Sequence, residues 1–269
     1  MLLSQDDILA FQDQLLSWFN RRGRDFSWRL TGDAYAVLVA EKLLQQTAAR
    51  NVVVRAYEQF LRLYPTPKRL AQACVQEIED IVRPLGFTYR AKDLHDTAQA
   101  LVTRHNGEVL RDLNALLALP GVGDYAARAV LSFVIGKDVP VVDTNWSIRQ
   151  ITATFRIALF AAIRWFSRVS CGDSAQPRGE MARQELAGWT TNVARFLYRL
   201  YGIPGSQPAN PARNKSLIKR ATMLVPPGHS REYNLAVLDL CALVCKVANP
   251  DCPVCPVQPY CTYGIKRVG

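Results

Sequence analysis

The chain has 269 residues, of which 49% are hydrophobic and 21% charged, a composition that excludes a disordered protein and indicates one or two folded domains. Lysine and arginine (33) outnumber aspartate and glutamate (23), and the formal net charge of +10 favours a polyanionic partner such as nucleic acid. The N-terminus lacks the features of a secretory signal, and the longest uncharged apolar run, residues 157–163, is too short to span a bilayer. We therefore expect a cytosolic protein without membrane contact.

Helical periodicity, with apolar residues three or four positions apart, runs through most of the chain, and strict alternation is scarce. Glycine and proline mark the breaks: Gly23 ends the first segment, Pro65 and Pro67 mark one turn, and Gly86 marks another. In chain order, the predicted helical segments are 9–19, 35–57, 94–102 and 116–135, the last being two helices joined by the turn at 120–123. The predicted fold class is therefore all-α.

Four of the seven cysteines lie close together near the C-terminus, with the spacing C-x6-C-x2-C-x5-C, namely Cys245, Cys252, Cys255 and Cys261. In a reducing compartment such a group indicates a metal site and not a disulfide framework. Four thiolates on a short irregular loop are the ligands that a [4Fe-4S] cluster needs. Structural zinc is the alternative, but its usual pattern has two C-x2-C pairs and this loop has one. The spacing therefore predicts an iron–sulfur cluster.

Two further motifs come before this loop. The sequence Leu119-Pro120-Gly121-Val122-Gly123 lies between two helical segments, and the free N–H groups at the start of the following helix could bind a DNA phosphate. Its alternative interpretation is an ordinary tight turn. Twenty residues after Gly123, Asp143 follows an apolar run; it could be a reactive carboxylate or simply a helix N-cap.

Together these motifs resemble the endonuclease III and MutY superfamily of helix-hairpin-helix DNA glycosylases. The resemblance is carried by four segments and covers nearly the whole chain; the segments are EKLLQQT at 41–47, LPGVG at 119–123, VVDTN at 141–145 and the cysteine loop at 245–261. It implies a six-helix barrel domain at 25–137 that contains the hairpin. It also implies a second helical domain, 1–24 plus 138–269, that carries the cluster, with duplex DNA bound in the cleft between the two.

The resemblance also implies roles for individual residues. Asp143 matches the catalytic aspartate, which stabilises the positive charge on the sugar or activates the nucleophile once the base has been flipped out. Gln46 matches the residue that fills the vacated stack, although it could be a solvated polar residue. Phe87, Tyr89 and Arg90 match, more loosely, a second loop that probes the DNA.

Position 125 bears on the reaction type. Bifunctional members of the superfamily have lysine there, which forms a Schiff base with the sugar, whereas Tyr125 cannot. We therefore expect a monofunctional glycosylase that leaves an abasic site and has no lyase activity; Lys42 and Lys137 are other lysines in the vicinity that could give weak adventitious cleavage. Mismatch thymine/uracil glycosylases resemble this chain in having tyrosine there and an acid at the place of Glu41. That acid could protonate or orient the leaving base, or it could be a helix-surface charge.

The predicted substrate is therefore double-stranded DNA with a G·T or G·U mismatch, bound by a monomer. An adenine glycosylase is the first alternative, which the motif at 24–29 slightly favours. Adenine glycosylases, however, typically have serine at position 125 and a further C-terminal domain that reads 8-oxoguanine, and we expect no such domain because the chain ends eight residues after Cys261. A non-catalytic or redox-sensing DNA-binding protein is the second alternative.

The chain departs from the superfamily directly after the VVDTN motif. The helix pattern that normally follows stands at 193–202, so residues 146–192 are predicted to be a 47-residue insertion. Removing them would join VVDTN to VARFLYRLYG. The alternative alignment places the superfamily helix at 146–155 and the insertion later. The arginines of 148–169 could contact DNA, or this segment could be a packed decoration.

Overall fold

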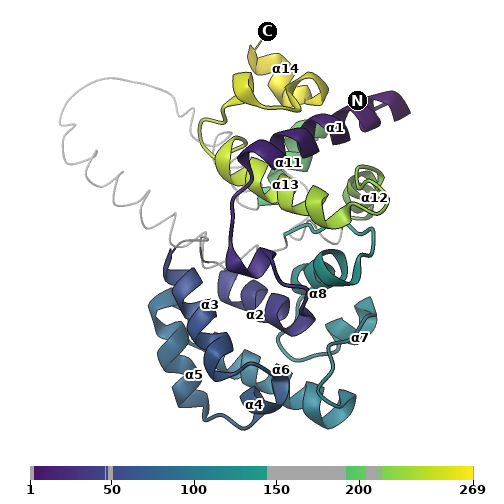
Figure 1. The fold of residues 1–269 in the computed structure, drawn as a ribbon. Helices are drawn as coiled ribbons and strands as arrows, with labels where there is room; N and C mark the ends of the chain where they lie inside the picture. Colours follow the sequence, from purple (N-terminus) through teal and green to yellow (C-terminus); the bar gives the residue numbers. More distant parts are fainter. Residues whose placement is uncertain are drawn as a thin grey trace, which may run out of the picture.

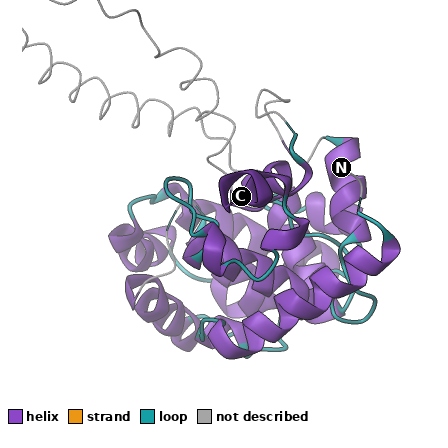
Figure 2. Ribbon diagram, turned by 90° about the horizontal axis from the view of Figure 1, so that it is seen from above, coloured by secondary structure: helices purple, strands orange, loops and turns teal. Residues whose placement is uncertain are grey.

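The computed structural model describes residues 3–45, 47, 51–143, 192–203, 211 and 214–268, and these residues form helices and no strand (Figures 1 and 2). The all-α prediction is confirmed for this part of the chain. Residues 146–191 of the predicted insertion and Gln46 lie outside the described residues. Among the described helices, none combines the length and apolar character that crossing a bilayer requires.

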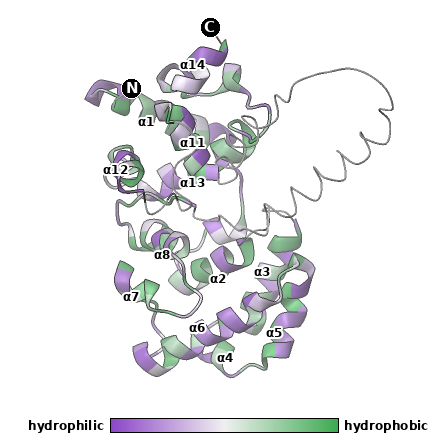
Figure 3. Cartoon of the chain, turned by 180° about the vertical axis from the view of Figure 1, so that it is seen from behind, coloured by the Kyte–Doolittle hydropathy of each residue, from purple (hydrophilic) through white to green (hydrophobic). Residues whose placement is uncertain are grey.

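The first helical body is formed by consecutive helices from the first half of the chain. They are α2 (Ala34–Leu44), α3 (Asn51–Leu63), α4 (Pro67–Ala71), α5 (Val75–Val82), α6 (Tyr89–His105), α7 (Leu113–Leu117) and α8 (Asp124–Val130), with the short turns η1 (Ser27–Arg29), η2 (Arg83–Leu85) and η3 (Leu131–Ile135). Helix α2 is buried on all sides, since every residue from Tyr35 to Leu43 is inaccessible. A helix that is apolar all round belongs at the centre of its domain. By contrast, α3 and α5 carry both hydrophobic and hydrophilic residues because only one face of each contacts the core (Figure 3).

The second helical body combines the N-terminal helix with the C-terminal part of the chain. It contains α1 (Gln5–Arg22), α11 (Asn192–Tyr201), α12 (Lys215–Met223), α13 (Ser230–Leu243) and α14 (Thr262–Val268), with η5 (Cys252–Val254) and η6 (Gln258–Tyr260). Helix α1 starts at a capping box in which the Ser4 hydroxyl accepts the Asp7 N–H and the Asp7 carboxylate accepts the Ser4 N–H. It then lies along α13 (Figure 1).

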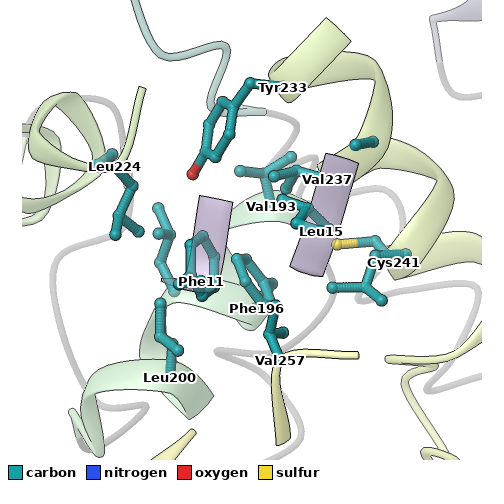
Figure 4. Close-up of a cluster of buried hydrophobic side chains, with 14 of the residues drawn as sticks. Phe11, Leu15, Val193, Phe196, Leu200, Leu224, Tyr233, Val237, Cys241 and Val257 are labelled. Carbon is teal, nitrogen blue, oxygen red and sulfur yellow. The ribbon is translucent and has the colours of Figure 1, made fainter. Parts of the chain in front are cut away.

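The core of the second helical body is shared between the N-terminal helix α1 and the C-terminal part of the chain. Phe11 and Leu15 of α1 are fully buried against Phe196 of α11 and Val257 of the C-terminal loop (Figure 4). Residues far apart in sequence therefore share one apolar cluster. Because burying each such side chain contributes roughly 1.5–3 kcal/mol, this cluster fixes α11 between α1 and the cysteine-bearing loop.

An ion-pair group joins the two helical bodies. Asp239 of α13 is fully buried, and its carboxylate accepts hydrogen bonds from the Arg24 backbone N–H (2.7 Å) and from both terminal nitrogens of Arg29 (2.8 Å each). The Arg24 guanidinium also pairs with it at 2.8 Å. Burial alone raises the pKa of Asp239, but the two arginines more than offset this effect, so the net pKa lies below its usual value.

Candidate functional site

Asp143 lies at the junction of the two helical bodies. The two residues before it point into different cores, because Val141 packs in the first helical body and Val142 in the second. Such an alternation is the mark of extended backbone. Asn234 of α13 holds this segment: its side-chain oxygen accepts the Val141 N–H at 2.9 Å, and its amide donates to the Val139 carbonyl at 2.9 Å. Sequence reasoning did not assign this positioning role to Asn234.

The carboxylate of Asp143 binds the N-terminus of α11. It accepts hydrogen bonds from the backbone N–H groups of Asn192 (2.5 Å), Val193 (2.9 Å) and Ala194 (3.3 Å). The first N–H groups of a helix have no partner within the helix, and the helix dipole favours a negative charge there. Asp143 therefore bonds as an N-cap residue does, but to a helix that begins 49 residues further along the chain, and these bonds are compatible with a catalytic role.

Burial sets the protonation of Asp143. It raises the pKa of this carboxyl, and the three N–H donors and the charge of Arg195 only partly counteract it. The carboxylate is half-buried and is held in place by its three N–H donors.

Glu41 and Tyr125 form a second pair of titratable groups beside Asp143. Glu41 on α2 is 6% exposed, which excludes the helix-surface interpretation, and its carboxyl group interacts with the side chain of Tyr125 near the start of α8. Burial raises the pKa of Glu41 to about 7, although the charge of Arg29 and the interaction with Tyr125 lower it. Burial also raises the pKa of Tyr125 far above its usual value, with further contributions from the charges of Glu41 and Asp143. The structure thus brings together Glu41, Tyr125 and Asp143.

Arg29 is a member of this group that sequence reasoning missed. Its positive charge acts on both Glu41 and Tyr125, and its guanidinium is fixed by the buried Asp239. The motif at 24–29 was visible in the sequence, but nothing there indicated that Asp239, more than 200 residues away, would hold it in place.

The predicted hairpin is built with its side chains inward and its glycines outward. Leu119 and Val122 are buried, whereas Gly121 and Gly123 are exposed. At Gly121, φ is +69°, and an added Cβ would lie 2.9 Å from the Cβ of Asp93. Both its conformation and its surroundings therefore require glycine.

Two side chains of the first helical body hold the carbonyl groups of this hairpin. Lys42 donates to the Gly121 carbonyl at 2.7 Å and pairs with Asp93 at 2.6 Å. Thr97 donates to the Pro120 carbonyl at 2.6 Å. Since the Lys42 ammonium is buried and bound twice, it is not placed as a free nucleophile.

The second predicted DNA-probing loop contains one residue that differs from expectation. Tyr89 is 46% exposed and contacts Phe87 edge to face, with ring centroids 5.9 Å apart. Arg90 is 0% exposed, and its N–H donors bind protein oxygens at the end of α2. The prediction that Arg90 contacts DNA therefore does not fit its position, because a buried guanidinium cannot reach a phosphate.

The four C-terminal cysteines, Cys245, Cys252, Cys255 and Cys261, line one cavity between α11, the C-terminal loop and α14. N–H donors point at the sulfur atoms: Arg199 donates to the sulfur of Cys245 and the Gly264 N–H to that of Cys261, both at 3.3 Å. Burial raises the pKa of Cys255 to about 12 and that of Cys261 to about 11, and the neighbouring thiols add to the shift. In the part of the chain that the structure describes, no three His, Cys, Asp or Glu side chains are placed to hold a metal ion.

Comparison with known proteins places this architecture among repair proteins. Residues 39–220 match the HhH-GPD superfamily, described as base excision DNA repair proteins. A solved structure of a thermostable thymine-DNA glycosylase superposes with a TM-score of 0.73 at 27% identity, covering 97% of this chain and 98% of that one.

Curated relatives show the same similarity in sequence. The chain is 34% identical over 266 residues to the thymine/uracil-DNA glycosylase of Pyrobaculum aerophilum, covering 97% of this chain and 94% of that protein. It is 31% identical to the thymine-DNA glycosylase of Aeropyrum pernix, covering 98% of each. The adenine DNA glycosylase of Mycobacterium tuberculosis is also 31% identical, but the match covers 91% of this chain and 64% of that protein.

Proposed function

The chain belongs to the HhH-GPD superfamily of base excision DNA repair proteins, and from this premise we propose that it is a monofunctional DNA glycosylase that removes thymine or uracil from G·T and G·U mismatches. The observation that carries the proposal is the group formed by the buried Glu41 and the half-buried Tyr125 and Asp143, with tyrosine at position 125 where a Schiff base would need lysine. Similarity to thymine-DNA glycosylases along the full length of both proteins supports the choice of base.

The geometry suggests how the glycosidic bond is hydrolysed. When the bond between C1′ and the base breaks, its electron pair leaves with the base and positive charge develops on the sugar. Asp143, ionised and fixed by α11, stabilises that charge. Glu41, with a pKa of about 7, retains a proton that it can donate to the leaving base. Water then adds to C1′ and loses a proton, leaving an abasic site.

Double-stranded DNA with a mismatched base is the proposed partner of the monomer. The exposed hairpin glycines, Gly121 and Gly123, and the net charge of +10 suit contact with the phosphate backbone. We place the DNA between the two helical bodies, with domain boundaries at 25–137 and at 1–24 plus 138–269, because Asp143 lies at their junction.

We further propose that the cysteine-lined cavity holds a [4Fe-4S] cluster through Cys245, Cys252, Cys255 and Cys261. The four thiols line one cavity, and their spacing contains a single C-x2-C pair where structural zinc usually has two, which favours the cluster over zinc. The N–H donors on Cys245 and Cys261 suit thiolate ligands. When bound, the cluster would join Cys245, which follows α13, to the loop at 252–261.

The direct test is single-turnover base release from duplexes that carry G·T, G·U, A·8-oxoG or A·G. We expect thymine and uracil to be released, and strand cleavage to require added alkali. Asp143→Asn should abolish release without unfolding the protein, because asparagine is also a good N-cap residue. Release of adenine would instead establish the adenine glycosylase, and release of no base would indicate a non-catalytic DNA-binding protein.

A further inference from the structure

Arg90, at the start of α6, reaches across to the C-terminal end of α2. Its guanidinium donates to the Leu43 carbonyl at 2.8 Å, to the Gln45 carbonyl, and to the Thr47 hydroxyl at 2.8 Å. The last carbonyl groups of a helix have no partner within the helix, and a cation near them is favourable. Arg90 therefore supplies donors that the backbone of this turn lacks.

The same side chain also contacts the loop that precedes α6. Its guanidinium lies over the ring of Phe87, 5.0 Å from the centroid, and Phe87 in turn contacts the exposed Tyr89. A planar guanidinium can stack on an aromatic ring while its edge donates several hydrogen bonds, which lysine cannot do. One buried side chain thus joins two segments that are about 40 residues apart in sequence.

We propose that Arg90 is a positioning residue that holds Gln45 and Thr47 of one segment and the loop at 86–89 of another in one fixed arrangement, ready for the duplex when a base is flipped. The inference rests on the proposed glycosylase function. In the sequence, Gln46 stands between the two residues of the turn whose oxygen atoms Arg90 binds.

The physical advantage is preorganisation. Extruding a base costs a few kcal/mol of stacking and pairing. If the two probing segments had to become ordered at the same moment, their lost conformational freedom would add to that cost. Arg90 fixes them before DNA arrives, so more of the binding free energy remains available for flipping.

The test compares Arg90→Lys with wild type and with the matched control Arg83→Lys. Arg83 lies seven residues away in η2, and its exposed side chain pairs with Asp80 at 2.7 Å. Base flipping is followed by the fluorescence of 2-aminopurine placed beside the mismatch. Affinity for an undamaged duplex is measured across salt concentrations. We expect Arg90→Lys to reduce the flipping rate at least about tenfold while affinity for the undamaged duplex changes less than about twofold, and Arg83→Lys to leave flipping unchanged.

Two outcomes would overturn the inference. Normal flipping by Arg90→Lys would show that the buried hydrogen bonds are dispensable. A loss of affinity for every duplex, with a salt dependence reduced by one phosphate contact, would show that Arg90 binds the DNA backbone. If Arg90→Lys does not fold, Thr47→Val decides the question, because it removes one acceptor and keeps the charge; it should slow flipping in the same direction, and normal flipping would again overturn the inference.

The flipping readout also separates this inference from the proposed function. If the wild-type protein flips bases that it does not release, the proposed function fails and the role of Arg90 can still be measured. If it releases thymine but Arg90→Lys flips normally, only the role of Arg90 fails.

Discussion

Glu41 lies on a helix without an exposed face, and this burial explains why a glutamate that is normally ionised at neutral pH has a pKa of about 7. The charge of Arg29 prevents a larger shift, and Asp239 keeps Arg29 in place. Asp143 is half-buried, which also raises its pKa, but three N–H groups and Arg195 favour its charged form. The surroundings of the two carboxyl groups therefore differ: Glu41 lacks the three N–H donors that stabilise the anion of Asp143, which suits Glu41 to act as an acid and Asp143 as an anion.

This difference predicts a bell-shaped dependence of single-turnover rate on pH. The rate should rise as Asp143 loses its proton, at a pH above the usual range for aspartate because its pKa is raised. It should fall as pH increases through about 7, because Glu41 then loses the proton that it donates. Glu41→Gln should lower the rate by roughly 10²–10⁴-fold and remove the fall at high pH. A descending limb that persists in Glu41→Gln would assign that proton to another group.

At the scale of elements, the N-terminus of α11 shows how the chain can hold its reactive carboxylate although a 47-residue insertion is predicted directly after the VVDTN motif. An N-cap aspartate accepts from the second and third residues that follow it in the helix. Asp143 accepts from Asn192 and Val193, which is the pattern expected if Asp143 stood directly before Thr191. The pair Thr-Asn occurs at both 144–145 and 191–192, so deleting 144–190 or 146–192 gives the same protein.

We therefore predict that a protein lacking residues 144–190 folds and retains base release. Its melting temperature should stay within a few degrees of the wild-type value, and its single-turnover rate should stay within about threefold, because the bonds from Asp143 to α11 are preserved. Circular dichroism and the base-release assay provide the measurements. A soluble, folded deletion protein with a large loss of rate would show that the segment takes part in catalysis or DNA binding.

At the scale of the whole molecule, distant parts of the chain hold the reactive groups at one junction. Asp239 of the second helical body fixes Arg24 and Arg29 beside the first, and Asn234 fixes the segment that leads to Asp143. Residues of the cysteine loop and of α11 line the same cavity. The site therefore depends on how the two helical bodies are assembled and on the anchoring of the C-terminal loop.

Loss of the proposed [4Fe-4S] cluster is the most direct test of how the C-terminal loop is anchored. The purified protein should be brown, absorb broadly near about 400 nm and contain about four irons per chain. Cys255→Ser should lower the iron content, the absorbance and the melting temperature together. The exposed Cys74 provides the matched control, and Cys74→Ser should change none of these. A colourless wild-type protein with stoichiometric zinc would contradict the iron–sulfur assignment.

Some of the site was predictable because its signals are local. The four-cysteine spacing, the glycines of the hairpin, and the acid after an apolar run each lie within a few residues, and their chemistry follows from residue type. The prediction that Arg90 contacts DNA was wrong because the partners of its side chain are distant in sequence. An arginine after an aromatic loop suits a surface contact, and only its bonds to Leu43, Gln45 and Thr47 reveal that it is buried.

The sequence by itself determined that this protein is helical, that four cysteines gather near its C-terminus, and that Asp143, Tyr125 and Glu41 belong to recognisable motifs. Only the tertiary structure decided that Glu41 is buried beside Tyr125, that Arg29 is held by Asp239, and that Asp143 binds the N-terminus of a helix 49 residues further on. The physical reason is that helix periodicity and residue chemistry are local properties. Burial, which sets these pKa values, depends instead on which distant segments pack around a group.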